Sequence, residues 1–140
     1  MRRWFLVVPL AATFAVVGCG GGPTAQERCR TELEPFMAAL GDLHSRLSVG
    51  LTYSEYTTRV GDVAVAHDGI RSEGLEPECR EVLAIAERAL ELHRLAQELW
   101  DTCIRSTTTS CDDPKIAKGL QDAWRGARTA LDRASSMIPS

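Results

Sequence analysis

The chain has 140 residues, of which 44% are hydrophobic and 25% are charged, and it contains five cysteines. Arg2 and Arg3 are the only charged residues in the first 18 positions, so the part of the chain from position 19 holds 14 basic residues against 19 acidic ones, a net charge of −5. This acidic balance argues against nucleic acid and against a bare anionic membrane surface as the partner. The remaining length is enough for one domain with its own core.

The N-terminal segment has the layout of an export signal. Two arginines precede an uncharged apolar run over 4–17, which is shorter than the about 20 residues of a membrane span. The run ends in Val16-Val17-Gly18-Cys19, which resembles a bacterial lipobox. This resemblance implies that residues 1–18 are a lipoprotein signal peptide, that Cys19 carries a lipid such as palmitate, and that the exported protein is anchored to a bacterial cell membrane, outside the cytoplasm. The alternative is an ordinary cleaved signal or a membrane helix, with Cys19 incidental.

A flexible tether is predicted after the lipidated cysteine. Residues 19–26 begin with a run of glycines followed by Pro23, a composition too flexible and polar to pack. About eight such residues reach roughly 15 Å. We therefore expect a folded domain over 27–140 that sits close to the bilayer.

The sequence of this domain predicts helices only, because it has no strand-like alternation and its apolar residues recur every three or four positions. The first helix carries its apolar stripe over 29–47, and Pro35 either kinks it or marks where its regular part begins. The second opens at Thr52, with Glu55 three residues later in a capping box, and Gly74 marks its end.

Two further helices place a proline at the first helical position. The third starts at Pro77 and runs to Cys103 with the widest apolar face, and the fourth runs from Pro114 to Met137. The three predicted connections are 48–51, 72–75 and 105–112. Short connections favour antiparallel neighbours, so the predicted fold is an all-α, antiparallel up-down four-helix bundle.

Four cysteines remain beyond the predicted lipid anchor, and an even number in an exported domain predicts two disulfides. A metal site is the alternative, but no two of these cysteines have the C-x-x-C spacing of common zinc sites. In an up-down bundle the first and third helices start at the same end, and the third ends where the fourth begins. The predicted bonds are Cys29–Cys79 and Cys103–Cys111, since any other pairing would cross the length of the bundle.

The three histidines form no recognisable catalytic or di-metal pattern. A ferritin-like site needs Glu three residues before His, and none of the three has it. Counting along the helices places His67 and His93 at similar depth, with His44 nearer the end opposite the anchor. The pair is interpreted as two core-edge histidines, and a pH-sensitive or weak metal-binding pair is the alternative. We expect no catalytic residue, no cofactor and no enzymatic activity.

An aromatic group marks the end of the bundle farthest from the predicted anchor. By the same count His44, Tyr53, Tyr56 and Trp100 lie there, near the disulfide that closes the last connection. Tyrosine and tryptophan dominate interface energetics, so these four residues are the candidate partner surface. The alternative is that Tyr56 and Trp100 form the top layer of the core.

These features favour a membrane-anchored, non-enzymatic lipoprotein that binds a protein or a cell-envelope component through the end far from the membrane. Nucleic acid is not an expected partner. The alternative function is a small-ligand or metal carrier that uses a site between the helices near His67 and His93.

Overall fold

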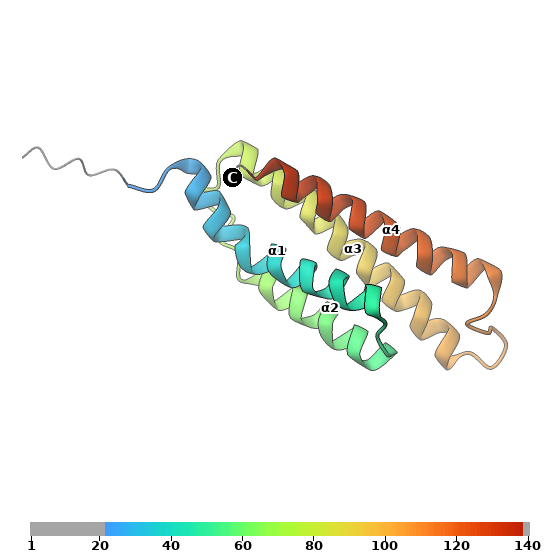
Figure 1. Ribbon diagram of the computed structural model, residues 1–140. Helices are drawn as coiled ribbons and strands as arrows, with labels where there is room; N and C mark the ends of the chain where they lie inside the picture. The colour runs from blue at the N-terminus through green and yellow to red at the C-terminus, as the bar shows by residue number, and fades with distance from the viewer. Residues whose placement is uncertain (1–21, 139–140) are drawn as a thin grey trace, which may run out of the picture.

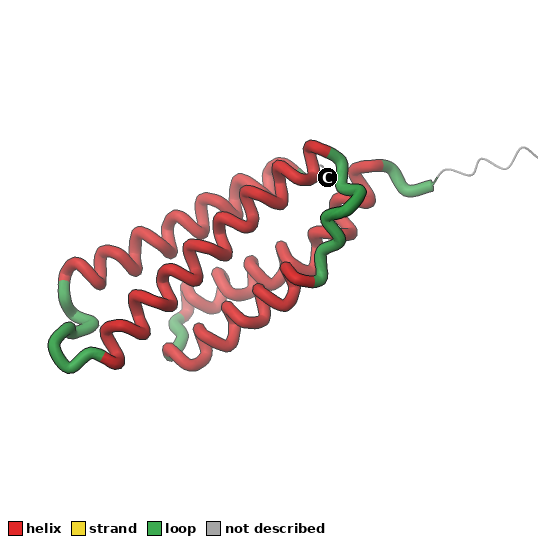
Figure 2. The backbone as a smooth tube through the Cα atoms, turned by 180° about the vertical axis from the view of Figure 1, so that it is seen from behind, coloured by secondary structure: helices red, strands yellow, loops and turns green. Residues whose placement is uncertain are grey.

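The computed structural model describes residues 22–138, and these residues form four α-helices and no strand. The helices are α1 (Ala25–Val49), α2 (Tyr53–Asp68), α3 (Pro77–Arg105) and α4 (Pro114–Met137). Consecutive helices run antiparallel and lie side by side (Figure 1), and Figure 2 shows the same bundle from behind. α3 pairs most extensively with α4, and α1 with α2. The predicted all-α four-helix bundle is confirmed, whereas the predicted signal peptide and Cys19 lie outside the described residues.

Capping boxes fix where the first two helices begin. Thr52 and Glu55 form the predicted box at the start of α2. Thr24 and Glu27 form a second box with the same spacing, which was not predicted from the sequence. Because of this box α1 begins at Ala25, two residues before the predicted start of the domain, so the last two residues of the predicted tether are helical.

Prolines open the other two helices at the predicted positions, Pro77 and Pro114. Asp113 caps α4 by accepting a hydrogen bond from the amide of Lys115. Pro35 instead lies inside α1, where it removes one backbone hydrogen bond. The axis of α1 changes direction along its first half (Figure 1), as expected for a kink at this proline.

The connection between α2 and α3 is longer than the sequence predicts. α2 ends at Asp68 rather than near Gly74, and residues 69–76 form the link. Gly74 has a φ of +92°, a backbone conformation that favours glycine. Ile70 lies between the end of α2 and Gly74, where the sequence predicts the second helix to continue, and it packs against the core from this link. An apolar residue beyond the true helix end can thus match a helical stripe.

A single hydrophobic core runs between the helices. α1 contributes large side chains that are fully buried, and α3 and α4 contribute alanines that let the two helices approach closely. Burial of one such large side chain stabilises the fold by about 1.5–3 kcal/mol. The large buried side chains of α1 are Leu33, Phe36, Leu40 and Leu43.

Both predicted disulfides are confirmed. Cys29–Cys79 joins the first turns of α1 and α3, with a Cα–Cα distance of 5.5 Å. Cys103–Cys111 closes the link between α3 and α4, with a Cα–Cα distance of 4.9 Å. We call the end with the first bond, where α1 begins, the proximal end, and the other the distal end. Two disulfides are typical of proteins in oxidising compartments outside the cytoplasm.

Two features of the described helices bear on location and shape. None of the helices within residues 22–138 is both long enough and apolar enough to cross a membrane. At the distal end the α3–α4 hairpin extends past the α1–α2 turn, as Figures 1 and 2 both show. The last turn of α3 therefore extends beyond the backbone of the α1–α2 turn.

Candidate functional site

A buried polar network lies at the centre of the predicted aromatic group. The hydroxyl oxygen of Tyr56 lies 3.0 Å from Nδ1 of His93 and 3.0 Å from the backbone oxygen of the same residue. Trp124 on α4 donates its indole N–H to this hydroxyl over 3.2 Å. A hydroxyl has one proton and two lone pairs. The hydroxyl uses its proton and both lone pairs if it donates to the backbone oxygen of His93 and accepts from the indole N–H of Trp124 and from a protonated Nδ1 of His93.

Burial sets the charge state of this network. Tyr56 is fully buried and His93 is 2% exposed. Burial, reinforced by the nearby His44, lowers the pKa of His93 to about 4, and burial also raises the pKa of Tyr56. Both side chains are therefore uncharged near neutral pH. A buried network of uncharged groups is suited to holding α2, α3 and α4 in register, because any shift would leave polar atoms unpaired.

His44 lies beside this network without joining its hydrogen bonds. Its Nδ1 and the hydroxyl oxygen of Thr57 are buried and have no hydrogen-bond partner among the described residues. The antiparallel register of α1 and α2, marked by the ion pair of Asp42 with Arg59, places residues 44 and 57 opposite each other. α1 and α2 therefore each hold one buried polar atom without a hydrogen-bond partner among the described residues.

The aromatic rings pack against one another from three helices. Tyr53 lies 5.7 Å from Trp100 between ring centroids, and Tyr56 lies 5.6 Å from Trp100. Trp124 lies 5.8 Å from Trp100 and 6.2 Å from Tyr56. Such edge-on and tilted pairs contribute about 0.5–1.5 kcal/mol each beyond their buried area. This cluster is first of all part of the core.

The predicted partner surface is therefore only partly a surface. Tyr56 is fully buried and cannot contact a partner in this conformation, which corrects its assignment to the candidate surface. His44 is half-buried between the helices, and Tyr53 and Trp100 are half-buried at the rim of the cluster. The hydroxyl of Tyr53 donates to Asp101 over 2.8 Å, which fixes the ring against α3.

Ile104 adds an exposed apolar side chain that was not predicted from the sequence. It lies one turn after Trp100 on the same face of α3, since residues four apart share a helix face. It is nevertheless 51% exposed, because the α1–α2 hairpin ends short of it. Val49, in the last turn of α1 next to the α1–α2 turn, is 89% exposed. We call Val49, Tyr53, Trp100 and Ile104 the distal shoulder.

The structure gives His67 and His93 different partners. Nε2 of His67 lies 2.9 Å from Glu87 on α3, and its Nδ1 lies 3.3 Å from Asp68. Its ring packs edge-on to Phe36 at 5.2 Å, whereas His93 bonds to Tyr56. Within residues 22–138 no group of three or more histidine, cysteine or acidic side chains is placed to hold a metal ion.

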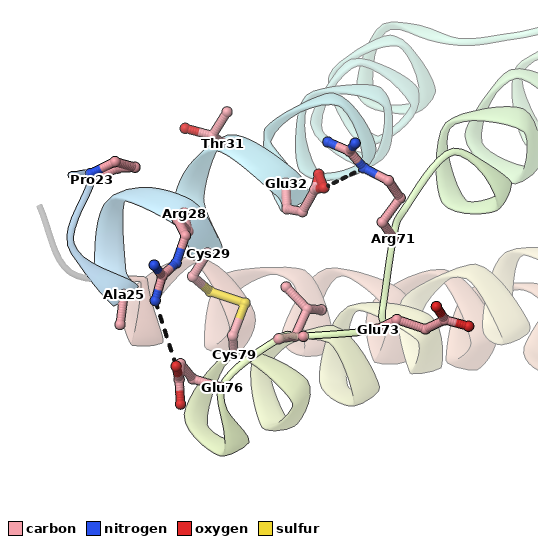
Figure 3. Close-up of a pocket in the computed structure, with 12 residues that line it drawn as sticks. Pro23, Ala25, Arg28, Cys29, Thr31, Glu32, Arg71, Glu73, Glu76 and Cys79 are labelled. Atoms are coloured by element: carbon pink, nitrogen blue, oxygen red, sulfur yellow. Dashed lines mark hydrogen bonds and ion pairs between the residues drawn. A yellow bond between two sulfur atoms is a disulfide. The ribbon is translucent and has the colours of Figure 1, made fainter.

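A cleft of about 290 Å³ lies at the proximal end, beside the Cys29–Cys79 bond (Figure 3). Two ion pairs cross it: Arg28 with Glu76 at 3.6 Å and Arg71 with Glu32 at 2.9 Å. Each arginine in the cleft thus already faces a carboxylate. Glu73 also lines the cleft and has no ion-pair partner among the described residues, but it is exposed, and this single carboxylate does not point to a particular ligand.

One of the two features that were not predicted, the contact of Trp124 with the aromatic group, does have a signal in the sequence. Trp124 lies on the apolar stripe of the fourth helix, four residues after Leu120, so its contact with the aromatic group could have been inferred from helix depth. The exposure of Ile104 follows from the unequal reach of two hairpins, which no local pattern encodes.

Comparison with other proteins adds no relative: the chain matches no protein-family model, no curated protein and no solved structure.

Proposed function

We propose that the chain is an exported, lipid-anchored protein without enzymatic activity, and that it binds a protein or a cell-envelope component through its distal shoulder. The observation that supports the binding surface is the exposure of Ile104, which lies one turn after Trp100 on α3, near the start of α2, and is 51% exposed. Apolar side chains next to half-buried aromatic rings are typical of the energetic centres of interfaces.

The anchor and the shoulder support each other in space. Cys19, the proposed lipidation site, precedes the proximal end of the bundle, and the shoulder lies at the opposite end. α3 has 29 residues, and a helix of this length is about 43 Å long at 1.5 Å per residue. A partner at the shoulder would thus meet the protein at the end far from the anchor. The two disulfides fit an exported domain.

The carrier alternative receives less support. A carrier site near His67 and His93 needs the two rings to face one cavity. His67 instead bonds to Glu87 at the surface, with 30% of its own side chain and 41% of that of Glu87 exposed. His93 bonds inside the core to Tyr56.

A site-specific cross-linking experiment tests the proposed surface in the membranes of the producing cell. A photo-activatable amino acid at position 49 is expected to capture one defined partner, and Ile104→Arg in the same chain is expected to abolish the adduct. The matched control carries the amino acid at Val65, which is 74% exposed in the C-terminal half of α2 and away from the shoulder. The same adduct from position 65, or no adduct from position 49, contradicts the proposal.

A further inference from the structure

The charges of this protein are segregated between its helices. α4 carries five basic residues, which include both lysines of the chain, and only two acidic residues, a net charge of +3. Since the chain from position 19 has a net charge of −5, the part outside α4 has a net charge of −8. The net negative charge of the domain argued against an anionic membrane surface as partner. This net charge is the sum of a basic helix and an acidic remainder, so it does not describe the surface of α4.

A groove of about 600 Å³ runs between α3 and α4 on the side of this basic helix. Its floor is apolar, and Gly126 leaves it open because the residue has no side chain: a Cβ there would lie 3.0 Å from a methyl carbon of Leu92. Ile85 and Ala130 continue the floor along the two helices. The groove is thus a shallow apolar depression rather than an enclosed cavity.

Three arginines line the groove, Arg88, Arg125 and Arg133, together with two acidic residues, Glu81 and Asp122, so the charged lining has a net charge of +1. Arg88 pairs with Glu91 and Arg125 with Asp122, each at 3.0 Å, but the two arginine side chains stay 63% and 71% exposed. Among the described residues Arg133 has no ion-pair partner. Exposed surface pairs of this kind are weak, so the guanidinium groups can rearrange toward a stronger anion.

We propose that this groove and the basic face of α4 bind the headgroups of an anionic phospholipid bilayer. The guanidinium groups would contact lipid phosphates, with which arginine forms bidentate hydrogen bonds, while the apolar floor would meet the upper part of the acyl chains. The occupant follows from charge complementarity: α4 has a net charge of +3 in a domain that is otherwise acidic, and its basic residues border the apolar floor of the groove.

The position of the groove fits this partner. Arg133 lies one turn before the end of α4, and that end lies near the start of α1, where the chain enters the bundle (Figure 1). The inference rests on the proposed lipid anchor, whose tether reaches roughly 15 Å. A domain held so closely can lie along the bilayer on α4, and the distal shoulder, which faces the α1–α2 side, stays accessible to a partner.

Vesicle flotation combined with arginine footprinting tests the groove. The full chain, purified from bacterial membranes, is mixed with vesicles of phosphatidylcholine alone or with about 30% phosphatidylglycerol, on the order of the charge needed for an anionic surface potential. Phenylglyoxal, an uncharged reagent, then modifies exposed arginines, which are quantified by mass spectrometry. We expect Arg88, Arg125 and Arg133 to react about fivefold more slowly on the anionic vesicles, the factor that corresponds to one basic residue near such a surface. Arg94, exposed on another face of α3, serves as the internal control.

Charge-reversal variants provide the matched comparison. Arg125→Glu/Arg133→Glu is expected to abolish the protection of Arg88 on anionic vesicles. Arg30→Glu/Arg94→Glu changes the net charge equally outside the groove and is expected to leave that protection intact. Protection should also weaken as salt shortens the Debye length below about 10 Å.

The results of flotation and footprinting distinguish failure of the groove proposal from failure of the lipid-anchor proposal. Flotation with both vesicle types and equal reactivity of the groove arginines on both overturns the groove proposal and leaves the anchor standing. Flotation only with anionic vesicles, together with groove protection, supports the groove and contradicts the anchor. Flotation with neither type overturns both. Equal protection of Arg94 also overturns the proposal, because it would show contact without preference for this face.

Discussion

The hydroxyl oxygen of Tyr56 on α2 lies 3.0 Å from Nδ1 of His93 on α3, and it accepts a hydrogen bond from the indole N–H of Trp124 on α4. One oxygen thus connects three helices in the middle of an otherwise apolar core. The bonds are local in space but distant in sequence, so they form only when all three helices are correctly packed.

Removal of this hydroxyl is expected to destabilise the bundle. Tyr56→Phe leaves the half-buried N–H of Trp124 and the buried Nδ1 of His93 without their partner, and an unpaired buried group reduces the free energy of unfolding by about 1–3 kcal/mol. Urea unfolding followed by circular dichroism measures the loss. The control is Tyr53→Phe, which removes one hydrogen bond to Asp101 at a half-buried site. We expect a smaller effect there, and equal losses in the two variants would contradict the assigned role of Tyr56.

Acid is expected to destabilise the protein through His93. Burial lowers the pKa of His93 to about 4 in the folded protein, against about 6.5 for an unperturbed histidine. Between these values the unfolded chain binds a proton that the folded protein does not. The contribution to stability is therefore complete above about pH 6.5 and is lost progressively as the pH falls toward about 4, by about 3 kcal/mol in total at about 1.36 kcal/mol per pKa unit.

The variant His93→Gln isolates this effect from the titration of carboxylates, which is common to both proteins. Urea midpoints measured from neutral pH down to about pH 4.5 should fall less steeply for the variant than for the wild type, because only the wild type takes up the extra proton on unfolding. His44 and Tyr56 face His93 and are retained in both proteins. Parallel pH profiles would show that His93 is not the responsible group.

Two helix-interior glycines are expected to respond differently to alanine. An added Cβ at Gly61 on α2 would meet no atom within 4 Å, so Gly61→Ala should stabilise the protein by about 0.5–1 kcal/mol through helix propensity. At Gly126 on α4 the same atom would lie 3.0 Å from Leu92, and the displacement of that leucine offsets the gain. Thermal unfolding of both variants checks the difference, and an equal or larger gain at Gly126 would contradict it.

The two disulfides are expected to contribute unequally. Cys29–Cys79 spans 50 residues and Cys103–Cys111 spans 8. Loop-closure entropy then gives about 4 kcal/mol for the first bond and about 2.5 kcal/mol for the second. Denaturant unfolding of the double variants Cys29→Ala/Cys79→Ala and Cys103→Ala/Cys111→Ala measures both losses. A larger loss from the second pair would show that the entropy of the unfolded chain does not set the order of the two contributions.

Periodicity and helix-start signals were enough to predict most of the fold. Proline at the first helical position and a threonine cap with its glutamate act within the first turn alone, so the starts of α2, α3 and α4 are encoded locally. The start of α1 has the same signal at Thr24 and was missed, while Ile70 extended the predicted second helix because an apolar residue in a link can match a helical stripe. The disulfide pairing followed from topology, since it depends only on which helix ends meet.

The sequence by itself determined that the protein is a helical bundle with two defined disulfides, because spacing, caps and chain connectivity act over a few residues or along one helix. Only the tertiary structure decided which aromatic residues are available to a partner. Tyr56 is buried and Ile104 exposed although both lie on apolar stripes, since exposure depends on how far the neighbouring hairpin reaches. The basic residues of α4 form a surface because α4 packs on α3 through its apolar stripe and leaves these residues exposed. This arrangement depends on how separate helices pack, which no single segment of the sequence contains.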